Sequence, residues 1–310
     1  MQDNFHETEH LPQEKLMQLI KKNDPAILKF VLMYSYILVT AVALVLSWGQ
    51  SIWLIILAHI AFAPGFCSSF ACEHETVHNT AFKSKLWNSL AAGLCGFVQL
   101  YVPTMFQELH FTHHRYTHIP GKDPEISFGG KPIPSSISSL PMYFSWISGL
   151  PLFIMKFIMF LAGIFGMPEF FRKAVFPFFR PRMRLAMFLD CLFLLAVHGT
   201  IITLAILLSP GFWFIYSGIL FGHCVLSVYL VPEHNGLPHE GNIMEKTRSM
   251  QTSNLLRSIM WNMPYHAEHH AYPAVPFHAL PALRKELEEE IQNYEQYPVF
   301  HLKVLSRKVK

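Results

Sequence analysis

The sequence predicts an all-α integral membrane protein with four transmembrane helices in two hairpins. Three observations predict this class: the composition, a set of long apolar segments, and the bias of positive charge between the loops. Of 310 residues, 52% are hydrophobic and only 15% are charged, which is more apolar than an ordinary soluble chain. The net charge of +3 comes without a basic stretch interleaved with aromatic residues, so we expect no nucleic-acid partner.

Four apolar segments approach the roughly 20 residues needed to cross about 30 Å of hydrocarbon. They are residues 30–47, 52–72, 185–208 and 211–231. Only residues 48–51 separate the first two, and Ser209 and Pro210 separate the last two, so each pair is predicted to form a tight hairpin. Segments 86–106 and 142–165 are interrupted by polar residues and proline, and we expect them in the interface or beneath the spans.

Positive charge predicts the orientation of the spans. The two short connections carry no lysine or arginine, whereas the N-terminal and middle segments are basic. The basic residues are Lys15, Lys21, Lys22, Lys29, Arg172, Lys173, Arg180, Arg182 and Arg184. This bias predicts that both termini are cytoplasmic, in the inner membrane if the protein is bacterial. The first 24 residues lack the pattern of a cleaved signal, so we expect the first span to act as an uncleaved insertion signal.

The predicted organisation has three parts. Residues 1–29 form a cytoplasmic N-terminal segment, residues 30–279 form the membrane domain, and residues 280–310 form a cytoplasmic C-terminal helix and tail. Arginine, lysine and clustered glutamates within 280–296 predict a soluble amphipathic helix there. The five cysteines lie mostly in apolar segments without close pairing, so they are predicted to be reduced packing residues.

Histidines recur in three tight motifs on the predicted cytoplasmic side. The motifs are HETVH (His74, His78), HFTHH (His110, His113, His114) and HAEHH (His266, His269, His270). Spacings of three and four place side chains on one helical face, so each motif is expected to direct its imidazoles at one point. Pro264 and Pro273 bracket the third motif as a short helix.

Eight converging imidazoles exceed the four ligands of a structural zinc ion and therefore predict a site for two metal ions on the cytoplasmic side. Imidazole suits iron, copper, nickel and zinc, so the spacing does not select the element. His6 and His10 repeat the spacing of the first motif in a polar terminal segment and are not expected to bind metal. His118 follows His114 by four residues and is considered as an added ligand or as an outer hydrogen-bonding partner.

These motifs resemble those of the membrane fatty acid desaturase superfamily, which includes desaturases, hydroxylases and carotenoid ketolases. The resemblance covers most of the chain, and its most specific part is WNMPYHAEHHAYPAVPFHALPAL at 261–283. It implies four spans, a cytoplasmic cap and two iron ions that use O2 as co-substrate. It also implies one more ligand after the fourth span, where His234 is the best match. His239 lies beyond Gly236 and Pro238, which carry the chain into a loop, and is predicted not to bind.

The resemblance also narrows the expected activity. Three residues separate the histidines of the first motif, as in acyl-lipid desaturases, hydroxylases and ketolases. We therefore expect a desaturase acting on a fatty acyl or similar lipid chain, with hydroxylation or ketolation as the alternative. Because no HPGG haem-binding signature is present, electrons are expected from a separate ferredoxin or cytochrome b5 type donor. A membrane zinc hydrolase and a non-catalytic metal or lipid carrier are the alternatives from other classes.

Several glutamates beside the motifs and three histidines within the spans are polar residues for which we expect specific partners. Carboxylates next to metal ligands commonly accept the second imidazole N–H, and solvated charge is the other interpretation. The candidates are Glu73, Glu75, Glu108, Glu233 and Glu268. His59, His198 and His223 lie within apolar segments, where polar side chains are costly. We interpret them mainly as hydrogen-bonded packing residues, with a substrate passage as the second interpretation for His223.

Overall fold

Four long helices in the described part of the chain, residues 11–21 and 25–308, are long and apolar enough to cross a membrane. The computed structural model places them at α2 (Pro25–Leu46), α3 (Ile52–Val77), α9 (Arg184–Leu207) and α10 (Trp213–Leu230). Each matches a predicted span to within a few residues, except that α3 continues to Val77. His74 therefore lies on the last turns of a span helix rather than after it, and this rigid support fixes its position.

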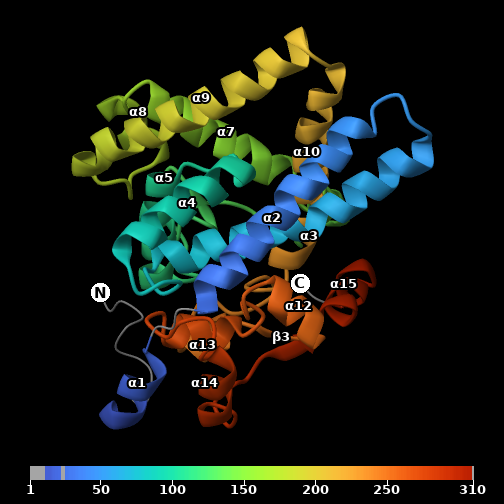
Figure 1. The fold of residues 1–310 in the computed structure, drawn as a ribbon. Coiled ribbons are helices and arrows are strands. Elements are labelled where there is room, and N and C mark those ends of the chain that lie inside the picture. Colours follow the sequence, from blue (N-terminus) through green and yellow to red (C-terminus); the bar gives the residue numbers. More distant parts are fainter. Residues whose placement is uncertain (1–10, 22–24, 309–310) are drawn as a thin grey trace.

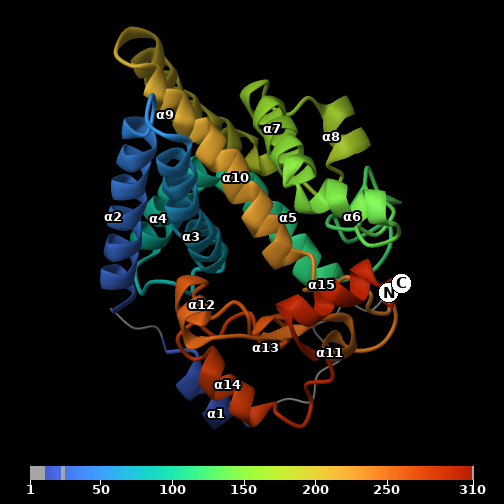
Figure 2. The ribbon, with the colours of Figure 1, turned by 90° about the vertical axis from the view of Figure 1, so that its right-hand side faces the viewer.

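Helices α2 and α3 pack against each other as a hairpin, whereas α9 and α10 diverge from their connecting turn (Figure 1). Helix α9 packs mainly against α7, and α10 packs mainly against α3, so the prediction of a tight hairpin was wrong for the second pair. Residues 47–51 join α2 to α3, and the short 3-10 turn η3 (Pro210–Phe212) joins α9 to α10. Helix α3 lies at the centre, where it packs against α2, α4 and α10. In Figure 2 the ends of α3 and α10 approach the cap from the same side. This arrangement brings the C-terminal turns of two spans to one level.

Two bent helix pairs account for the less regular apolar segments. Helix α4 (Lys85–Gln99) meets α5 (Pro103–Tyr116) at 97°, and α6 (Leu140–Ile147) meets α7 (Leu150–Ile164) at 58°. If each pair were one broken span, the number of candidate spans would rise to six. Proline at the start of α5 cannot continue the preceding helix. Between α6 and α7, Gly149 has a φ of +73°.

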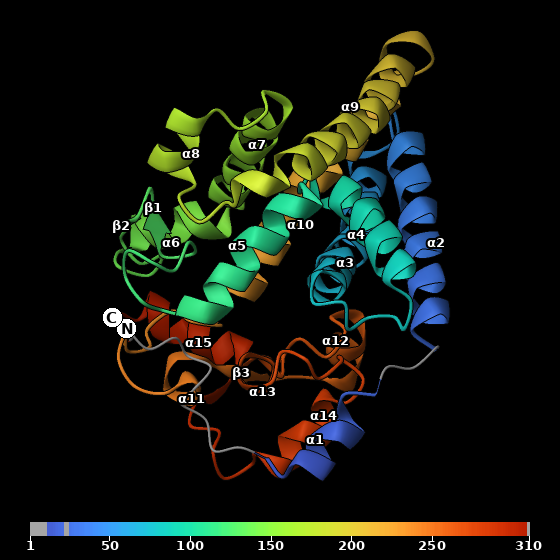
Figure 3. The same cartoon turned by 90° about the vertical axis from the view of Figure 1, so that its left-hand side faces the viewer.

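Gly149 also lies against the backbone of α10. A Cβ atom added at this position would be 2.4 Å from the carbonyl carbon of His223, which no side chain could tolerate. The bend between α6 and α7 therefore depends on glycine both for its left-handed backbone and for this close approach. It directs α7 away from α6, so that α7 packs against α9 and α10 and lies beside α8 on the side of α6 away from the cap (Figure 3).

Lys156, within α7, is fully buried rather than exposed to lipid. Its ammonium group donates to the side-chain oxygen of Gln99, at 3.0 Å, and to the backbone carbonyl of the same residue, at 3.2 Å. The Tyr101 ring lies 4.8 Å from the same nitrogen. Lys156 and Gln99, the polar residues that interrupt the two apolar segments, thus satisfy each other across the interface between α7 and α4.

Short elements form a cap over the ends of α3, α5 and α10. They are α1 (Gln13–Leu19), α11 (Ile243–Lys246), β3 (Ser249–Gln251), α12 (Asn254–Ile259), α13 (His266–Ala271), α14 (Leu280–Glu286), β4 (Tyr294–Gln296) and α15 (Tyr297–Leu305). Strands β3 and β4 pair in parallel, with Met250 opposite Glu295. The remaining elements follow α5 and α7 in the chain. These are β1 (Ser127–Phe128), β2 (Lys131–Pro132), α8 (Glu169–Val175) and the 3-10 turn η2 (Pro181–Met183).

The predicted helix over 280–296 is shorter in the structure. Helix α14 ends at Glu286, and the chain then runs to β4. Glutamates at 286 and 288–290 would place negative charge at the negative end of a longer helix, which is unfavourable. Pairing of β4 with β3 gives the segment a different set of backbone hydrogen bonds. The prediction of one continuous helix was therefore wrong after Glu286.

All five cysteines are free, and four of them are buried, which confirms their interpretation as reduced packing residues.

Candidate functional site

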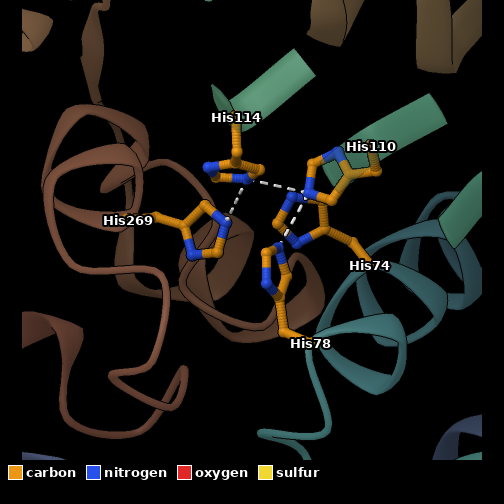
Figure 4. A group of neighbouring side chains, drawn as sticks. All are labelled: His74, His78, His110, His114 and His269. Atoms are coloured by element: carbon orange, nitrogen blue, oxygen red, sulfur yellow. Dashed lines mark hydrogen bonds between the residues drawn. The ribbon is translucent and has the colours of Figure 1, made fainter. Parts of the chain in front are cut away.

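The nine predicted histidines come together in two adjacent groups beneath the spans. The first histidine cluster consists of His74, His78, His110, His114 and His269 (Figure 4). The second histidine cluster consists of His113, His234, His266 and His270. The His114 and His270 rings stack at a centroid distance of 4.2 Å and join the two clusters. The motifs at the end of α3, in α5 and in α13 thus meet although they are far apart in sequence.

Helical geometry explains how the histidines divide between the clusters. Residues separated by four lie on one helical face, whereas neighbouring residues point in directions about 100° apart. In α5, His110 and His114 belong to the first cluster and His113 to the second. Helix α13 shows the reverse arrangement, because its i, i+4 pair serves the second cluster and the intervening His269 serves the first. The expectation that each motif directs its histidines at one point was therefore wrong for HFTHH and HAEHH.

The Nε2 atoms within each cluster lie at the spacing of ligands around a shared ion. In the first cluster, His110 Nε2 is 2.8 Å from His78 Nε2 and 2.9 Å from His114 Nε2. In the second, His266 Nε2 is 2.8 Å from His234 Nε2. Two nitrogens bound at about 2.1 Å and at a right angle to each other would be about 3 Å apart. The donor set therefore fits a metal ion in each cluster.

Most of the imidazoles are held in the neutral form that can bind a cation. Burial lowers the pKa of His266 to about 3. Burial, followed by the neighbouring histidines, also holds the pKa values of His234, His269 and His270 well below the ordinary value. These rings are neutral near pH 7, so each has a nitrogen lone pair available without first losing a proton. His113 is the exception: burial lowers its pKa, but the carboxylates of Asp123 and Glu125 outweigh burial and raise it to about 9, so a metal ion would have to displace a proton from this ring.

Outer hydrogen bonds fix the direction of two rings in the second cluster. His113 Nδ1 donates to Asp123, whose carboxylate oxygens are 2.9 and 3.0 Å away. His234 Nδ1 donates to the carbonyl of Lys246 at 3.1 Å. In both residues the Nδ1–H bond leaves Nε2 as the lone-pair atom that faces the cluster.

Asp123 was missed in the sequence because it lies outside the histidine motifs. It is fully buried, and its carboxylate also accepts the backbone N–H groups of His118, at 2.7 Å, and Glu125, at 2.9 Å. The D-P pair after the Pro120–Gly121 break marks a turn, but sequence spacing does not show that this turn folds back onto His113.

The five glutamates next to the motifs are buried, but none of them makes a hydrogen bond to a clustered imidazole among the described residues. Glu108 pairs with Arg180, Glu268 with Arg284 and Ser249, and Glu75 with Thr80 and the backbone N–H of Phe277. Both carboxylate oxygens of Glu73 lack a hydrogen-bond partner. Glu233 comes nearest, with an oxygen 3.7 Å from His266 Nδ1, a distance too long for a hydrogen bond. The expected role as imidazole acceptors is therefore wrong for the other four, and Glu233 makes only this longer contact.

The remaining predicted histidines lie outside both clusters. His118 Nδ1 donates to the Pro238 carbonyl at 2.8 Å, and His239 Nδ1 donates to the His118 carbonyl at 3.0 Å. His59 contacts Ser217, and His198 contacts Phe97 and Tyr216, which confirms them as hydrogen-bonded packing residues. His223 Nδ1 bonds to Ile219 within α10. His6 and His10 lie outside the described residues.

A largely apolar cavity of about 460 Å³ opens directly beside both clusters. Its lining includes His74 and His110 from the first cluster and His113, His234 and His266 from the second. The opposite walls come mainly from α5, α7, the segment around α8 and the end of α10. They include Phe70, Phe106, Trp146, Leu152, Met155, Met159, Phe176 and Leu230. His223 is not part of this lining. The volume and apolar surface suit a flexible hydrocarbon chain.

Comparison with known proteins places these features in a family. The family model described as fatty acid desaturase matches residues 46–302. The chain is also 26% identical over 244 residues to a sphingolipid delta(4)-desaturase of Komagataella phaffii (strain GS115). That similarity covers 74% of this chain and 60% of the length of the yeast protein. Because the family match includes both histidine clusters and most of the chain, the protein belongs to the fatty acid desaturase family.

Proposed function

We propose that the protein is an oxygen-dependent di-iron desaturase that acts on a fatty acyl or similar lipid chain. The observation that carries this proposal is the position of two buried histidine clusters beside a largely apolar cavity of about 460 Å³. Nine imidazoles without a carboxylate in either cluster suit iron as well as copper, nickel or zinc, and the match to the fatty acid desaturase family favours iron among them. A zinc hydrolase would need only three protein ligands and an open water position, and a carrier would not need two clusters at one cavity.

The nine histidines are proposed as the ligands, five for one ion and four for the other. When bound, the reduced iron pair would supply oxygen activation and the removal of hydrogen from an alkyl carbon. The lipid acyl chain loses two hydrogen atoms. Together with these, two electrons from the donor and two protons reduce O2 to two water molecules. We propose that a separate ferredoxin or cytochrome b5 type donor supplies the electrons.

The protein's own contribution is to position the chain and exclude water. Most of the cavity's lining residues are apolar, including phenylalanine, leucine, methionine and proline side chains, which favour a hydrocarbon over water. Since both clusters reach this lining, a chain lying along the cavity would present one short stretch of its carbons to the metals. Fixed placement of that stretch would decide which bond is attacked.

The proposed orientation places the cap in the cytoplasm, as the distribution of positive charge suggests. Helices α1 and α15 both lie on the cap side of the spans (Figure 2). This arrangement supports cytoplasmic N- and C-terminal segments, 1–29 and 280–310, on either side of the membrane domain 30–279.

Lipid analysis of cells that express the protein tests the activity. We expect acyl chains that have lost two hydrogens, in aerobic cultures supplied with a reductase system, and no such change in cells expressing a His110→Ala variant. Gain of one oxygen atom instead would identify a hydroxylase. An unchanged lipid profile under these conditions would contradict the proposed oxidation of a lipid chain.

Asp123→Asn is expected to weaken metal binding by about 10- to 100-fold, as loss of an outer partner commonly does. The amide leaves one oxygen to accept from His113 and replaces the other with a donor, so the ring loses its fixed orientation. Metal retention against a competing chelator measures the effect. Asp190→Asn is the matched control, because this residue accepts the backbone N–H of Thr104 away from the clusters. Equal metal retention in the two variants would show that Asp123 does not orient His113 for metal binding.

A further inference from the structure

A second cavity lies outside the histidine site, at the junction of the first span and the cap. It has a volume of about 290 Å³ and lies between the first turns of α2 and helix α12. Two cations, Lys29 and Arg257, line it together with the aromatic side chains of Trp261, Tyr265 and Phe277. No aspartate or glutamate is among its lining residues, so positive charge in this cavity has no local compensation.

The two cations have only neutral partners. Lys29 Nζ donates to the backbone carbonyl of Ser258 at 2.5 Å and lies 5.2 Å from the centre of the Trp261 ring. Arg257 makes long contacts with Asn254, at 3.5 Å, and with the Tyr294 hydroxyl, at 3.4 Å. Its Nε atom is buried without a hydrogen-bond partner. An arginine in this state has unused donors in the planar arrangement that binds phosphate well.

The position of the cavity indicates where its ligand comes from. Lys29 lies one turn inside the first span, at the depth where lipid headgroups meet the hydrocarbon. Trp261 and Tyr265 are buried, and both place aromatic side chains along the cavity wall beside the two cations. Basic pockets between span ends are known to bind anionic lipid headgroups. A soluble anion could reach the same cations from the aqueous side through the exposed residues Asn254 and Ser258.

The wall of this cavity is directly connected to the histidine site. Trp261 and Asn262 have φ angles of +50° and +60°, and the left-handed backbone is strained for tryptophan. The segment 261–265 leads straight into α13, which carries His266, His269 and His270. Any ligand that contacts Trp261 and Tyr265 therefore also restrains the backbone that positions these histidines.

From these observations we propose that the cavity binds a phosphate group, supplied by the headgroup of an anionic membrane lipid, and that the bound group stabilises the segment that carries the third histidine motif. The phosphate oxygens accept from Lys29 and Arg257, and the aromatic rings enclose the adjoining part of the headgroup. This site is separate from the proposed catalytic cavity, so it does not depend on the reaction being a desaturation.

Thermal unfolding of the full-length protein in nanodiscs tests the proposal. Adding a minor fraction of phosphatidic acid to phosphatidylcholine is expected to raise the Tm by at least about 4 °C. In a Lys29→Gln/Arg257→Gln variant the same lipid should bind about 30-fold more weakly, which corresponds to loss of two cations at a membrane surface. Arg182→Gln/Arg307→Gln removes the same charge from exposed positions outside the cavity and should behave as the wild type.

A second variant separates loss of the site from loss of folding. Asn254→Glu places a carboxylate at the exposed mouth of the cavity, one helical turn from Arg257, without altering a buried residue. It should keep the wild-type Tm in phosphatidylcholine and lose the increase with phosphatidic acid. Inorganic phosphate added to the protein in phosphatidylcholine nanodiscs tests the other source of a phosphate group. If it raised the Tm as much as phosphatidic acid does, and did not raise the Tm of Asn254→Glu, the phosphate site would stand but its ligand would be a soluble one. The same increase in all variants, or none in the wild type, would overturn the proposal.

Discussion

His234→Ala is expected to lose iron from the second histidine cluster and to abolish lipid oxidation. His234 Nε2 lies 2.8 Å from His266 Nε2, and its ring is 4.8 Å from that of His113. Removal of this ring leaves the cluster with three imidazoles and takes away a donor whose direction is set by the Lys246 carbonyl. The loss of activity should exceed the roughly 10- to 100-fold effect typical of an outer partner. Iron content and lipid oxidation measure the two effects.

His239→Ala is the matched control for this substitution. His239 lies on the same loop and lines the same cavity, but its Nδ1 donates to the backbone of His118. It belongs to neither cluster. Its alanine variant should keep its iron and at least most of its activity. Full iron occupancy in His234→Ala, or loss of iron from His239→Ala alone, would contradict the proposed ligand set.

Met155→Trp is expected to reduce activity by about 100-fold while the iron content stays unchanged. Met155 lines the apolar cavity from α7 and is only half-buried, so a larger ring can extend into the space proposed for the lipid chain. Displacing a substrate by as little as 1 Å can cost about 100-fold in rate. Turnover of the cellular lipid that the expression experiment shows to be oxidised, measured together with metal content, separates a blocked cavity from a damaged metal site.

Ile154→Trp is the matched control, because it introduces the same tryptophan at the neighbouring position, which faces outward. Ile154 is 46% exposed, so tryptophan can point into the surrounding lipid, and activity should be close to that of the wild type. If both variants were equally active, the cavity beside the clusters would not be the path of the substrate. If both lost iron, the effect would be on folding of α7 and not on the cavity.

The spans could be predicted because crossing a membrane imposes a length and an apolar composition that appear directly in the sequence. The bends within the two interrupted segments could not be located in the same way. Leu100, at the bend between α4 and α5, has a φ of +53°. Leucine rarely adopts this left-handed conformation, so its presence in the sequence does not predict a bend. The contact of Gly149 with α10 depends on how the helices pack, which no local pattern contains.

The histidines were all predicted, whereas their division between two clusters was not. Spacing shows which residues share a helical face, but the relative rotation of α5 and α13 decides that His113 joins His270 while His269 joins His114. The roles of the acidic residues were even less visible. Proximity in sequence favoured the glutamates, whereas the carboxylate that orients His113 belongs to Asp123, ten residues along the chain.

Metal analysis of anaerobically purified protein tests the central proposal most directly. Five imidazoles in the first cluster and four in the second provide the donors for two ions, so about two iron atoms per chain are expected. His110→Ala should contain less iron than the wild type, since this residue contacts both His78 and His114 in the first cluster. Recovery of about one zinc and no iron per chain would contradict the account and favour a hydrolase-type site.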